Sequence, residues 1–270
     1  MTSHLVRRPS APAVTTPGPN RFRSFDPKAL AFLRALKRNN DREWFRARKA
    51  RYDELLRQPM TALVERLAAD LKTFAPQIVA DPKSAIYRIY RDTRFSDDKT
   101  PLKTHIAASF PTRGLARHAG AGLYLEVAPG WVWVGGGMYA PETSQLQLVR
   151  EHIAANHRQL RAIVESPGFV KGVGPLSGEQ LQRTPRGFAS DHPAAVYLKY
   201  RQFLAGRQFP AAFATSPRFY ASVVGIFQLV APLTAFLNEP LLGERAAASA
   251  SSRRAGRREL GTSGEENPLD

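Results

Sequence analysis

Hydrophobic residues recur at helical spacing through the first third of the chain, beginning near Ser24. Leu30, Leu33 and Leu36 lie on one side of a predicted helix, and Asp26 is a suitable N-cap for it. Further apolar stripes follow, and Pro59 suits the first position of a new helix. The pattern predicts three helices, at residues 27–39, 41–58 and 59–74.

After Asp81 the helical spacing gives way to alternation, which is typical of strands. The clearest signal is "LYLEVAPGWVWVGGG", where Ala128-Pro129-Gly130 makes a tight connection between two strands of a hairpin. The predicted strands are residues 84–91, 104–112, 123–127 and 131–134.

Helical spacing returns at Glu142. The remaining predicted helices are residues 142–165, 193–204 and 219–237, with a Gly/Pro-rich loop at 166–190. Helices on both sides of a run of strands favour an α+β fold over repeated βαβ units. The predicted architecture is a single α+β domain: N-terminal helices, a central antiparallel sheet that contains the hairpin, and C-terminal helices.

The two ends of the chain lack this organisation. Residues 1–23 hold four prolines and four arginines without an acid, and they predict a disordered arm. Residues 243–270 are of low complexity and predict a disordered tail. The single domain is therefore expected to span residues 24–242.

Residues 219–237, "FYASVVGIFQLVAPLTAFL", contain no charge and approach the length of a membrane span. Ser222, Gln228 and Thr234 dilute this stretch, and Pro232 interrupts it. We interpret it as a buried helix that kinks or ends near Pro232, and we predict no membrane association.

The composition is 43% hydrophobic and 23% charged, as in soluble globular proteins. The absence of cysteine excludes disulfides, thiol nucleophiles and thiolate metal sites, and it fits the reducing cytoplasm. The net charge is +16, and residues 24–242 hold 30 basic and 18 acidic residues of the total. Such a basic body attracts phosphates and other anions, although the arginine preference of a GC-rich genome gives the same composition.

The densest polar segment is "IYRIYRDTRFSDDKTPLK", at residues 86–103. In an extended conformation its alternate arginines and Asp92 share one face, and the turn at "SDDKTP" returns the lysines toward that face. Arginine and lysine at this density could bind phosphate or carboxylate, and an aspartate could act as a base if its pKa were raised. The predicted ligand-binding residues are Arg88, Arg91, Arg94, Lys99 and Lys103, and the predicted catalytic residues are Asp92 and Asp98.

Motifs for the common chemistries G-x-x-x-x-G-K-[ST], G-x-S-x-G and H-E-x-x-H are absent from the sequence. Three glycines follow the second hairpin strand, and their N–H groups could cradle a phosphate, so Gly136 and Gly137 join the predicted ligand-binding residues. The alternative is a strand end that admits another backbone closely. No histidine pair has metal-ligand spacing, so no metal site is predicted and the cofactor is left unknown.

Four stretches resemble, in order, the DUF2461 family of uncharacterised conserved proteins. They are "FLRALKRNNDREWF" (32–45), "YRIYRDTRFSDDKTPLKTH" (87–105), "GGGMYAP" (135–141) and "PRGFASDHPAAVYLKYRQF" (185–203). Leu102 departs from the resemblance, because an aromatic residue is expected there. The resemblance implies no activity, but polar blocks of this kind more often frame a shared cleft than a core.

The hypothesis is therefore a soluble, cytoplasmic protein that binds a small phosphate- or carboxylate-bearing ligand through the 86–103 cluster; whether it is an enzyme stays open. One alternative is nucleic-acid binding, because Tyr87, Tyr90 and Phe95 lie among arginines. A second is a metal-dependent hydrolase or phosphoryl-transfer enzyme that uses the aspartates. The third is an interaction scaffold in which the cluster is a structural ion-pair network.

Overall fold

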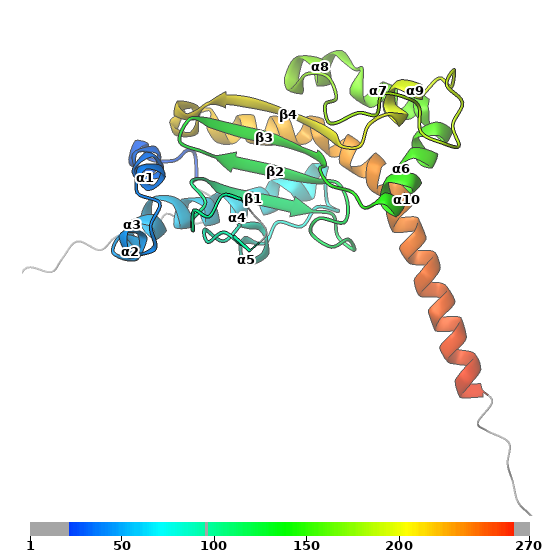
Figure 1. The fold of residues 1–270 in the computed structure, drawn as a ribbon, viewed down its shortest axis with the longest axis horizontal. Coiled ribbons are helices and arrows are strands. Elements are labelled where there is room, and N and C mark those ends of the chain that lie inside the picture. The colour runs from blue at the N-terminus through cyan, green and yellow to red at the C-terminus, as the bar shows by residue number, and fades with distance from the viewer. Residues whose placement is uncertain (1–21, 95–96, 262–270) are drawn as a thin grey trace, which may run out of the picture.

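The computed structural model describes residues 22–94 and 97–261, and its fold is α+β as the sequence predicts. Four antiparallel strands form one sheet in the order β1-β2-β3-β4 (Figure 1). The strands are β1 (Ile106–Pro111), β2 (Gly122–Val127), β3 (Trp131–Met138) and β4 (Phe203–Pro210). Strand neighbours in space are neighbours in sequence, so the sheet is a meander.

Helices precede and follow the first three strands. The N-terminal helices are α1 (Pro27–Arg38), α2 (Arg42–Arg46), α3 (Lys49–Tyr52), α4 (Gln58–Phe74) and α5 (Pro82–Ala85). The later helices are α6 (Thr143–Ala155), α7 (His157–Val164), α8 (Pro167–Val173), α9 (Ala195–Leu198) and α10 (Phe219–Gly261). The predicted hairpin is confirmed as β2 and β3, and the predicted helix at 27–39 is confirmed as α1, with the Asp26 side chain accepting from Lys28 N.

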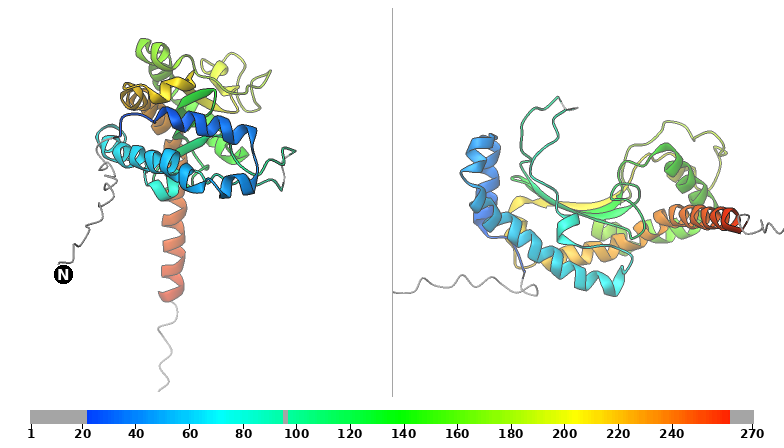
Figure 2. Two further views of the ribbon diagram at one scale, coloured as in Figure 1. Left: turned by 90° about the vertical axis from the view of Figure 1, so that its left-hand side faces the viewer. Right: turned by 90° about the horizontal axis from the view of Figure 1, so that it is seen from below.

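The two faces of the sheet differ in what covers them. Helices α4 and α10 lie beside each other on one side (Figures 1 and 2), and Leu125 and Val134 are fully buried toward them. The Phe110 and Phe227 rings meet across this layer with centroids 5.6 Å apart. Tyr124 and Trp133 occupy the opposite face and are half-buried, so this face of the sheet is left open.

Helix α10 continues through Pro232 and Pro240 as far as Gly261. Its stretch Phe219–Arg245 is long and apolar enough to cross a membrane by length and composition, and 56% of its most apolar window is buried inside the protein. Phe227 and Leu233 on it are fully buried. This burial matches a core helix, as predicted, but the helix does not end near Pro232.

The limits of the domain differ from the prediction at both ends. Phe22 is buried against Phe25, with ring centroids 5.3 Å apart, so the folded body includes a residue that was assigned to the arm. The tail predicted from residue 243 is helical as far as Gly261. The rest of the two predicted segments, residues 1–21 and 262–270, lies outside the described residues.

The predicted break between helices at Pro59 is wrong, because the chain is helical without interruption from Lys49 to Phe74. A π-helical turn, Asp53–Arg57, ends two residues before Pro59, so the hydrogen-bond pattern changes just before the residue that lacks an N–H donor. The predicted helix 142–165 is divided at Asn156 into α6 and α7. Helix α8 lies inside the predicted loop, where Ser166 caps it.

Two element types were predicted wrongly. Residues 84–91 do not form a strand: after α5 the chain is extended but pairs only at isolated bridges, Ile86 with Ala108 and Tyr90 with Leu102. Within the predicted helix 193–204 only α9 is helical, and β4 begins at Phe203. Pairing with β3 decides this second case, since sheet context overrides the weak local preference of a segment that contains glycine.

Candidate functional site

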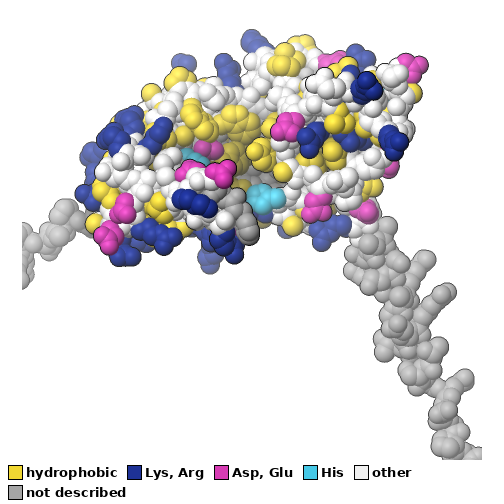
Figure 3. Space-filling view, in the orientation of Figure 1, with side chains coloured by type: hydrophobic (Ala, Val, Ile, Leu, Met, Phe, Trp, Pro, Cys, Tyr) yellow, Lys and Arg dark blue, Asp and Glu magenta, His cyan; other side chains and the backbone are white. Residues whose placement is uncertain are grey.

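The open face of the sheet is hollowed into a cavity of about 720 Å³. In the right-hand view of Figure 2, the loop that carries residues 91–94 and 97–104 rises over one edge of this face. Hydrophobic side chains gather in the hollow, and basic side chains lie mostly around it (Figure 3). The strands contribute Ser109, Tyr124, Glu126, Trp131, Trp133 and Gln208, and the walls include Tyr87, Lys103, His105, Arg117, His118 and Tyr139.

Cross-strand glycine pairs leave part of the cavity floor without side chains. Gly122 lies opposite Gly137, and Gly135 lies opposite Gly206. A Cβ atom on Gly135 or Gly206 would come within 2.8 Å or 2.6 Å of the Trp133 indole. Such a contact is impossible without displacing the ring, so these two glycines allow the indole to extend along the sheet.

The structure places the two glycines of the predicted site in the cavity wall, but within a strand. Strand β3 continues through Met138, and Gly136 and Gly137 are paired with both β2 and β4. Their N–H groups therefore face neighbouring strands, unlike those of a phosphate-binding loop at a strand end. Gly137 has φ +126°, which other residues rarely adopt, and a Cβ there would lie 1.9 Å from Phe203 O.

Glu126 is the acidic residue of the cavity lining, and both of its oxygens have partners. Tyr124 donates its hydroxyl to Glu126 Oε2 at 2.7 Å, and His105 Nδ1 lies 3.2 Å from Glu126 Oε1. Only 11% of the Glu126 side chain is exposed. A carboxyl group held in this way cannot turn out to solvent, so its charge state is part of the chemistry of the cavity.

Burial sets the proton affinity of both partners. It raises the pKa of Glu126, although the Tyr124 hydrogen bond and Lys103 act in the opposite direction. Burial, together with the positive charges of Lys103 and Arg91, lowers the pKa of His105 to about 4, against the attraction of the neighbouring carboxylate. His105 is therefore a neutral ring at pH 7, able to donate one hydrogen bond to Glu126.

Two cations meet at the ring of Tyr87. Lys103 Nζ lies 4.6 Å and the Arg117 guanidinium carbon 4.0 Å from its centroid, and His118 stacks on the same ring at 6.2 Å. Arg117 also donates to Ala85 O, and its buried Nε has no hydrogen-bond partner. Among the residues that the structure describes, neither cation has an ion pair within 4 Å. Burial, then the charges of Arg117 and Arg88, lower the pKa of Lys103.

The predicted 86–103 cluster is divided by the structure. Asp92 forms an ion pair with Arg94 at 2.7 Å, and Asp98 forms one with Arg91, all in the exposed loop. Lys99 donates to Thr93 O at 3.1 Å in the same loop. Arg88 is exposed and has no ion pair within the described part of the chain. Of the predicted cations only Lys103, the last residue of the segment, lines the cavity.

Neither aspartate has the raised pKa that a base at this position requires. Hydrogen bonds from the Arg94 side chain and backbone lower the pKa of Asp92 to about 2. Hydrogen bonds from the Thr100 backbone and hydroxyl, and then from Arg91, lower the pKa of Asp98 to about 2. Both carboxylates therefore stay ionised at neutral pH, and the carboxyl group with a raised pKa is Glu126 instead.

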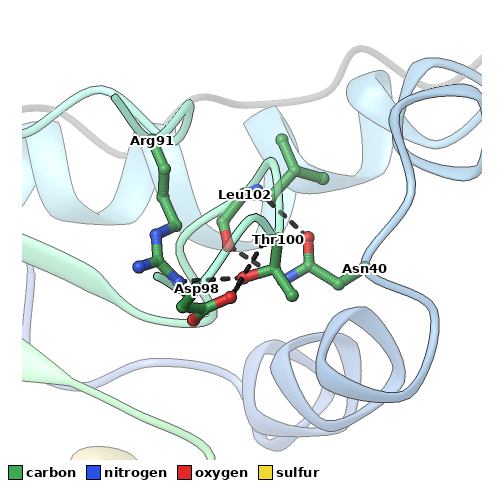
Figure 4. A network of polar contacts seen from close by, with 5 residues as sticks. All are labelled: Asn40, Arg91, Asp98, Thr100 and Leu102. Atoms are coloured by element: carbon green, nitrogen blue, oxygen red, sulfur yellow. Dashed lines mark hydrogen bonds and ion pairs between the residues drawn. The ribbon is translucent and has the colours of Figure 1, made fainter. Parts of the chain in front are cut away.

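A side-chain clamp from the α1–α2 turn holds the returning end of the loop. Asn40 Nδ2 donates to Leu102 O at 2.9 Å, and Leu102 N donates to Asn40 Oδ1 at 3.0 Å. Figure 4 shows this pair of bonds beside the Arg91–Asp98–Thr100 contacts. Lys103 follows directly and donates its N–H to Ile89 O at 2.8 Å. The clamp thus fixes the backbone from which Lys103 enters the cavity.

Sequence reasoning did not select Glu126, Tyr124, Trp133 or Arg117 as site residues. The alternation in "LYLEV" puts Tyr124 and Glu126 on one face of a strand, and this was the available signal. Arg117 had none, because it comes from an irregular segment between β1 and β2.

Metal-dependent chemistry needs a cluster of ligands. No group of three His, Asp or Glu side chains that could hold a metal ion is found within residues 22–94 and 97–245, whose side chains the structure describes. Asp92 and Asp98 of the loop bind arginines and a threonine.

Comparison with known proteins gives one match. The sequence model of the family described as "Conserved hypothetical protein (DUF2461)" matches residues 28–236, most of the chain. No curated protein and no solved structure matches the chain.

Proposed function

We propose, for this chain, which belongs to the DUF2461 family, that it binds a small anionic ligand in the cavity on the open face of its sheet. The observation that carries the proposal is the pair of cations at Tyr87. Lys103 and Arg117 approach one aromatic ring, and neither has an ion pair among the described residues. A bound phosphate or carboxylate would supply the missing negative charge.

Electrostatics favours an anion at this position. Burial lowers the pKa of Lys103 most, and the charges of Arg117 and Arg88 lower it further, so these neighbours make the local potential positive. Partial burial weakens the screening of these charges by water, so an anion placed between them gains more than it would at an exposed pair. Arg117 donates through Nη2 to Ala85 O, and its Nη1, which has no hydrogen bond among the described residues, is the group that can donate to an oxyanion.

This proposal keeps the ligand class expected from the sequence and moves the site. The cations of the loop, Arg91 and Arg94, already hold aspartates. A cavity of about 720 Å³ suits a small molecule, whereas a nucleic acid would need an extended basic groove. The cytoplasmic location expected from the sequence is part of the same proposal.

The test compares two lysines of the same segment. Inorganic phosphate and acetate are titrated against wild type, Lys103→Met and Lys99→Met, with thermal shift and calorimetry as readouts. Both substitutions remove one positive charge and keep the side-chain length. We expect at least one anion to stabilise wild type and Lys99→Met, and to bind at least about tenfold more weakly to Lys103→Met.

Two results would reject the cavity. Loss of binding in Lys99→Met with normal binding in Lys103→Met would return the site to the exposed loop. Absence of binding to wild type, for both anions, would remove the anion-binding function altogether. Binding that falls steeply with salt and is seen only with oligonucleotides would favour the nucleic-acid alternative.

A further inference from the structure

We infer that the ligand carries a planar aromatic ring beside its anionic group, and that this ring stacks in the tryptophan-lined part of the cavity. The inference rests on the proposed function, because it assigns the anionic group to Lys103 and Arg117. It adds the chemical class of the rest of the ligand.

The cavity is far larger than the anion that its cations would hold. Its volume of about 720 Å³ lies in the range of sites for drug-sized ligands, and a phosphate or carboxylate group fills only a small part of that. The remainder of a ligand must therefore contact the other walls, and the chemistry of those walls identifies it.

Those walls are aromatic. Trp131, Trp133, Tyr124 and Tyr139 line the cavity. The Tyr124 ring lies 6.3 Å from Tyr87, which the two cations contact, and 5.8 Å from Trp133 at a tilt of 54°. Figure 3 shows the corresponding gathering of hydrophobic side chains in the hollow. Tilted aromatic walls accept a further ring by stacking or edge contact at a similar separation.

The sheet is built to present one of these rings. Gly135 and Gly206 have no side chains, and the outer edge of the Trp133 indole lies over both of them. Two glycines on neighbouring strands weaken a sheet, since each raises the entropy of the unfolded chain and packs nothing. Here they give the indole its place along the cavity floor.

The rim supplies a largely exposed aromatic side chain. Tyr139 is 70% exposed, although it directly follows β3 and lines the cavity. Gln208 and Ser109, which also line the cavity, offer hydrogen bonds to polar atoms at the edge of a ring. An aromatic floor with a few polar groups and a cationic end matches a ligand with one ring and one anionic group.

The experiment uses ligand pairs that differ only in the ring. Phenyl phosphate is compared with inorganic phosphate, and benzoate with acetate and with cyclohexanecarboxylate, which has the same charge and a non-planar ring. Dissociation constants come from calorimetry, and quenching of tryptophan fluorescence gives a second readout. We expect the aromatic member to bind about 5- to 150-fold more tightly than its ring-free partner, the range found for ring stacking.

Two exposed tyrosines provide matched variants. Tyr139→Ala should remove part of the preference for phenyl phosphate and leave the affinity for inorganic phosphate within about twofold. Tyr90→Ala should change neither, because Tyr90 is 47% exposed and contacts Phe45 outside the cavity. Trp133→Leu should have the larger effect, and its folding is checked by far-UV circular dichroism; Tyr139→Ala decides the matter if that variant fails to fold.

The outcomes separate this inference from the proposed function. Equal affinity for phosphate and phenyl phosphate, or for benzoate and cyclohexanecarboxylate, would contradict the inferred aromatic ring of the ligand. It would not contradict the proposed anion site. A preference for phenyl phosphate that survives both cavity variants also overturns it, because the ring then binds elsewhere. If no anion of either series binds, the proposed function fails and the ring inference fails with it.

Discussion

At the scale of single residues, folding shifts the pKa values of Glu126 and His105 in opposite directions, although Glu126 Oε1 and His105 Nδ1 lie only 3.2 Å apart. Burial raises the pKa of Glu126 and lowers that of His105, so each group favours its neutral form in the folded protein. A neutral His105 adds no charge to the cavity, so the cations that line it beside Tyr87 are Lys103 and Arg117.

His105 makes stability depend on pH in a defined window. Its pKa falls from 6.5 to about 4 on folding, so between these values the unfolded chain binds the proton and the folded protein does not. Stability contributed by His105 is therefore present above pH 6.5 and is lost as the pH falls toward 4, by at most about 3 kcal/mol. We expect His105→Gln, which can still donate to Glu126, to lose less stability than wild type between pH 7 and 4.5 in urea unfolding.

The matched variant at the partner residue should show the reverse sign. Because the folded-state pKa of Glu126 is raised, its contribution is present at low pH and is lost as the pH rises through that pKa. Glu126→Gln should accordingly lose less stability than wild type on raising the pH. Identical pH profiles for wild type and His105→Gln would show that His105 does not carry the acid sensitivity.

The same residues mark how far the sequence led to the site. The basic segment predicted Lys103 as a site residue, and the alternation in the hairpin puts Tyr124 and Glu126 on one face of a strand. Alternation cannot tell which face of a sheet the helices will cover, because that depends on where α10 packs. The loop has the arginines expected of a ligand site, but they form ion pairs with Asp92 and Asp98 of the same loop.

At the scale of elements, the clamp between the α1–α2 turn and the 86–103 segment is expected to matter more than the ion pairs of that segment. Asn40 satisfies both backbone groups of Leu102, a residue with no exposed surface, whereas the pairs of Asp92 and Asp98 are exposed to water. Exposed pairs contribute little to stability, so the structural ion-pair alternative has little support from this segment.

Asn40→Ala should destabilise the protein by about 2 kcal/mol, because it leaves the buried N–H and C=O of Leu102 without partners. The neighbouring Asn39→Ala is the control: the Asn39 side chain donates to Ala35 O at an exposed helix end, and its loss should cost less than about 1 kcal/mol. Urea unfolding measures both. Equal effects of the two substitutions would mean that the clamp does not hold the segment.

The element types that were mispredicted share one cause. Residues 84–91 have the composition of a strand, but they bridge β1 only at Ile86–Ala108 and the returning loop only at Tyr90–Leu102, so they form bridges and no ladder. Residues 203–210 include Gly206 and end at Pro210, yet they form β4 because β3 offers a complete pairing edge. In both cases the secondary structure depends on the strand that is available for pairing, and the local sequence pattern does not show which strand that is. Helix α1 needed no partner to be predicted, since its cap and its apolar stripe are local.

At the scale of the whole molecule, α10 ties the helical ends of the domain to the sheet. It packs against β2, β3 and β4 and against α4, α6, α7 and α8. Phe219, at its start, contacts both Phe22 and Phe25, the first aromatic residues of the described chain. Because this helix contacts segments from the whole length of the chain, a substitution that destabilises it should lower the stability of the whole domain.

Phe227→Ala tests this expectation, since Phe227 is fully buried on α10 and meets Phe110 of β1. Removing the ring should cost about 3–5 kcal/mol, whereas Gln228→Ala, at an exposed position one residue on, should change the stability by less than about 0.5 kcal/mol. Tryptophan fluorescence can follow the two regions separately, because Trp44 lies among the N-terminal helices, and Trp131 and Trp133 lie on the sheet.

In a Trp44→Phe background the fluorescence follows the sheet, and with both sheet tryptophans replaced by phenylalanine it follows the N-terminal helices. We expect Phe227→Ala to lower the two unfolding midpoints by the same amount, because a single cooperative domain gives coincident transitions. If only the sheet signal moved, the N-terminal helices would be an independent unit. The Asn40 clamp would then act between two units, and Lys103 would be placed in the cavity by a contact that can open without unfolding the sheet.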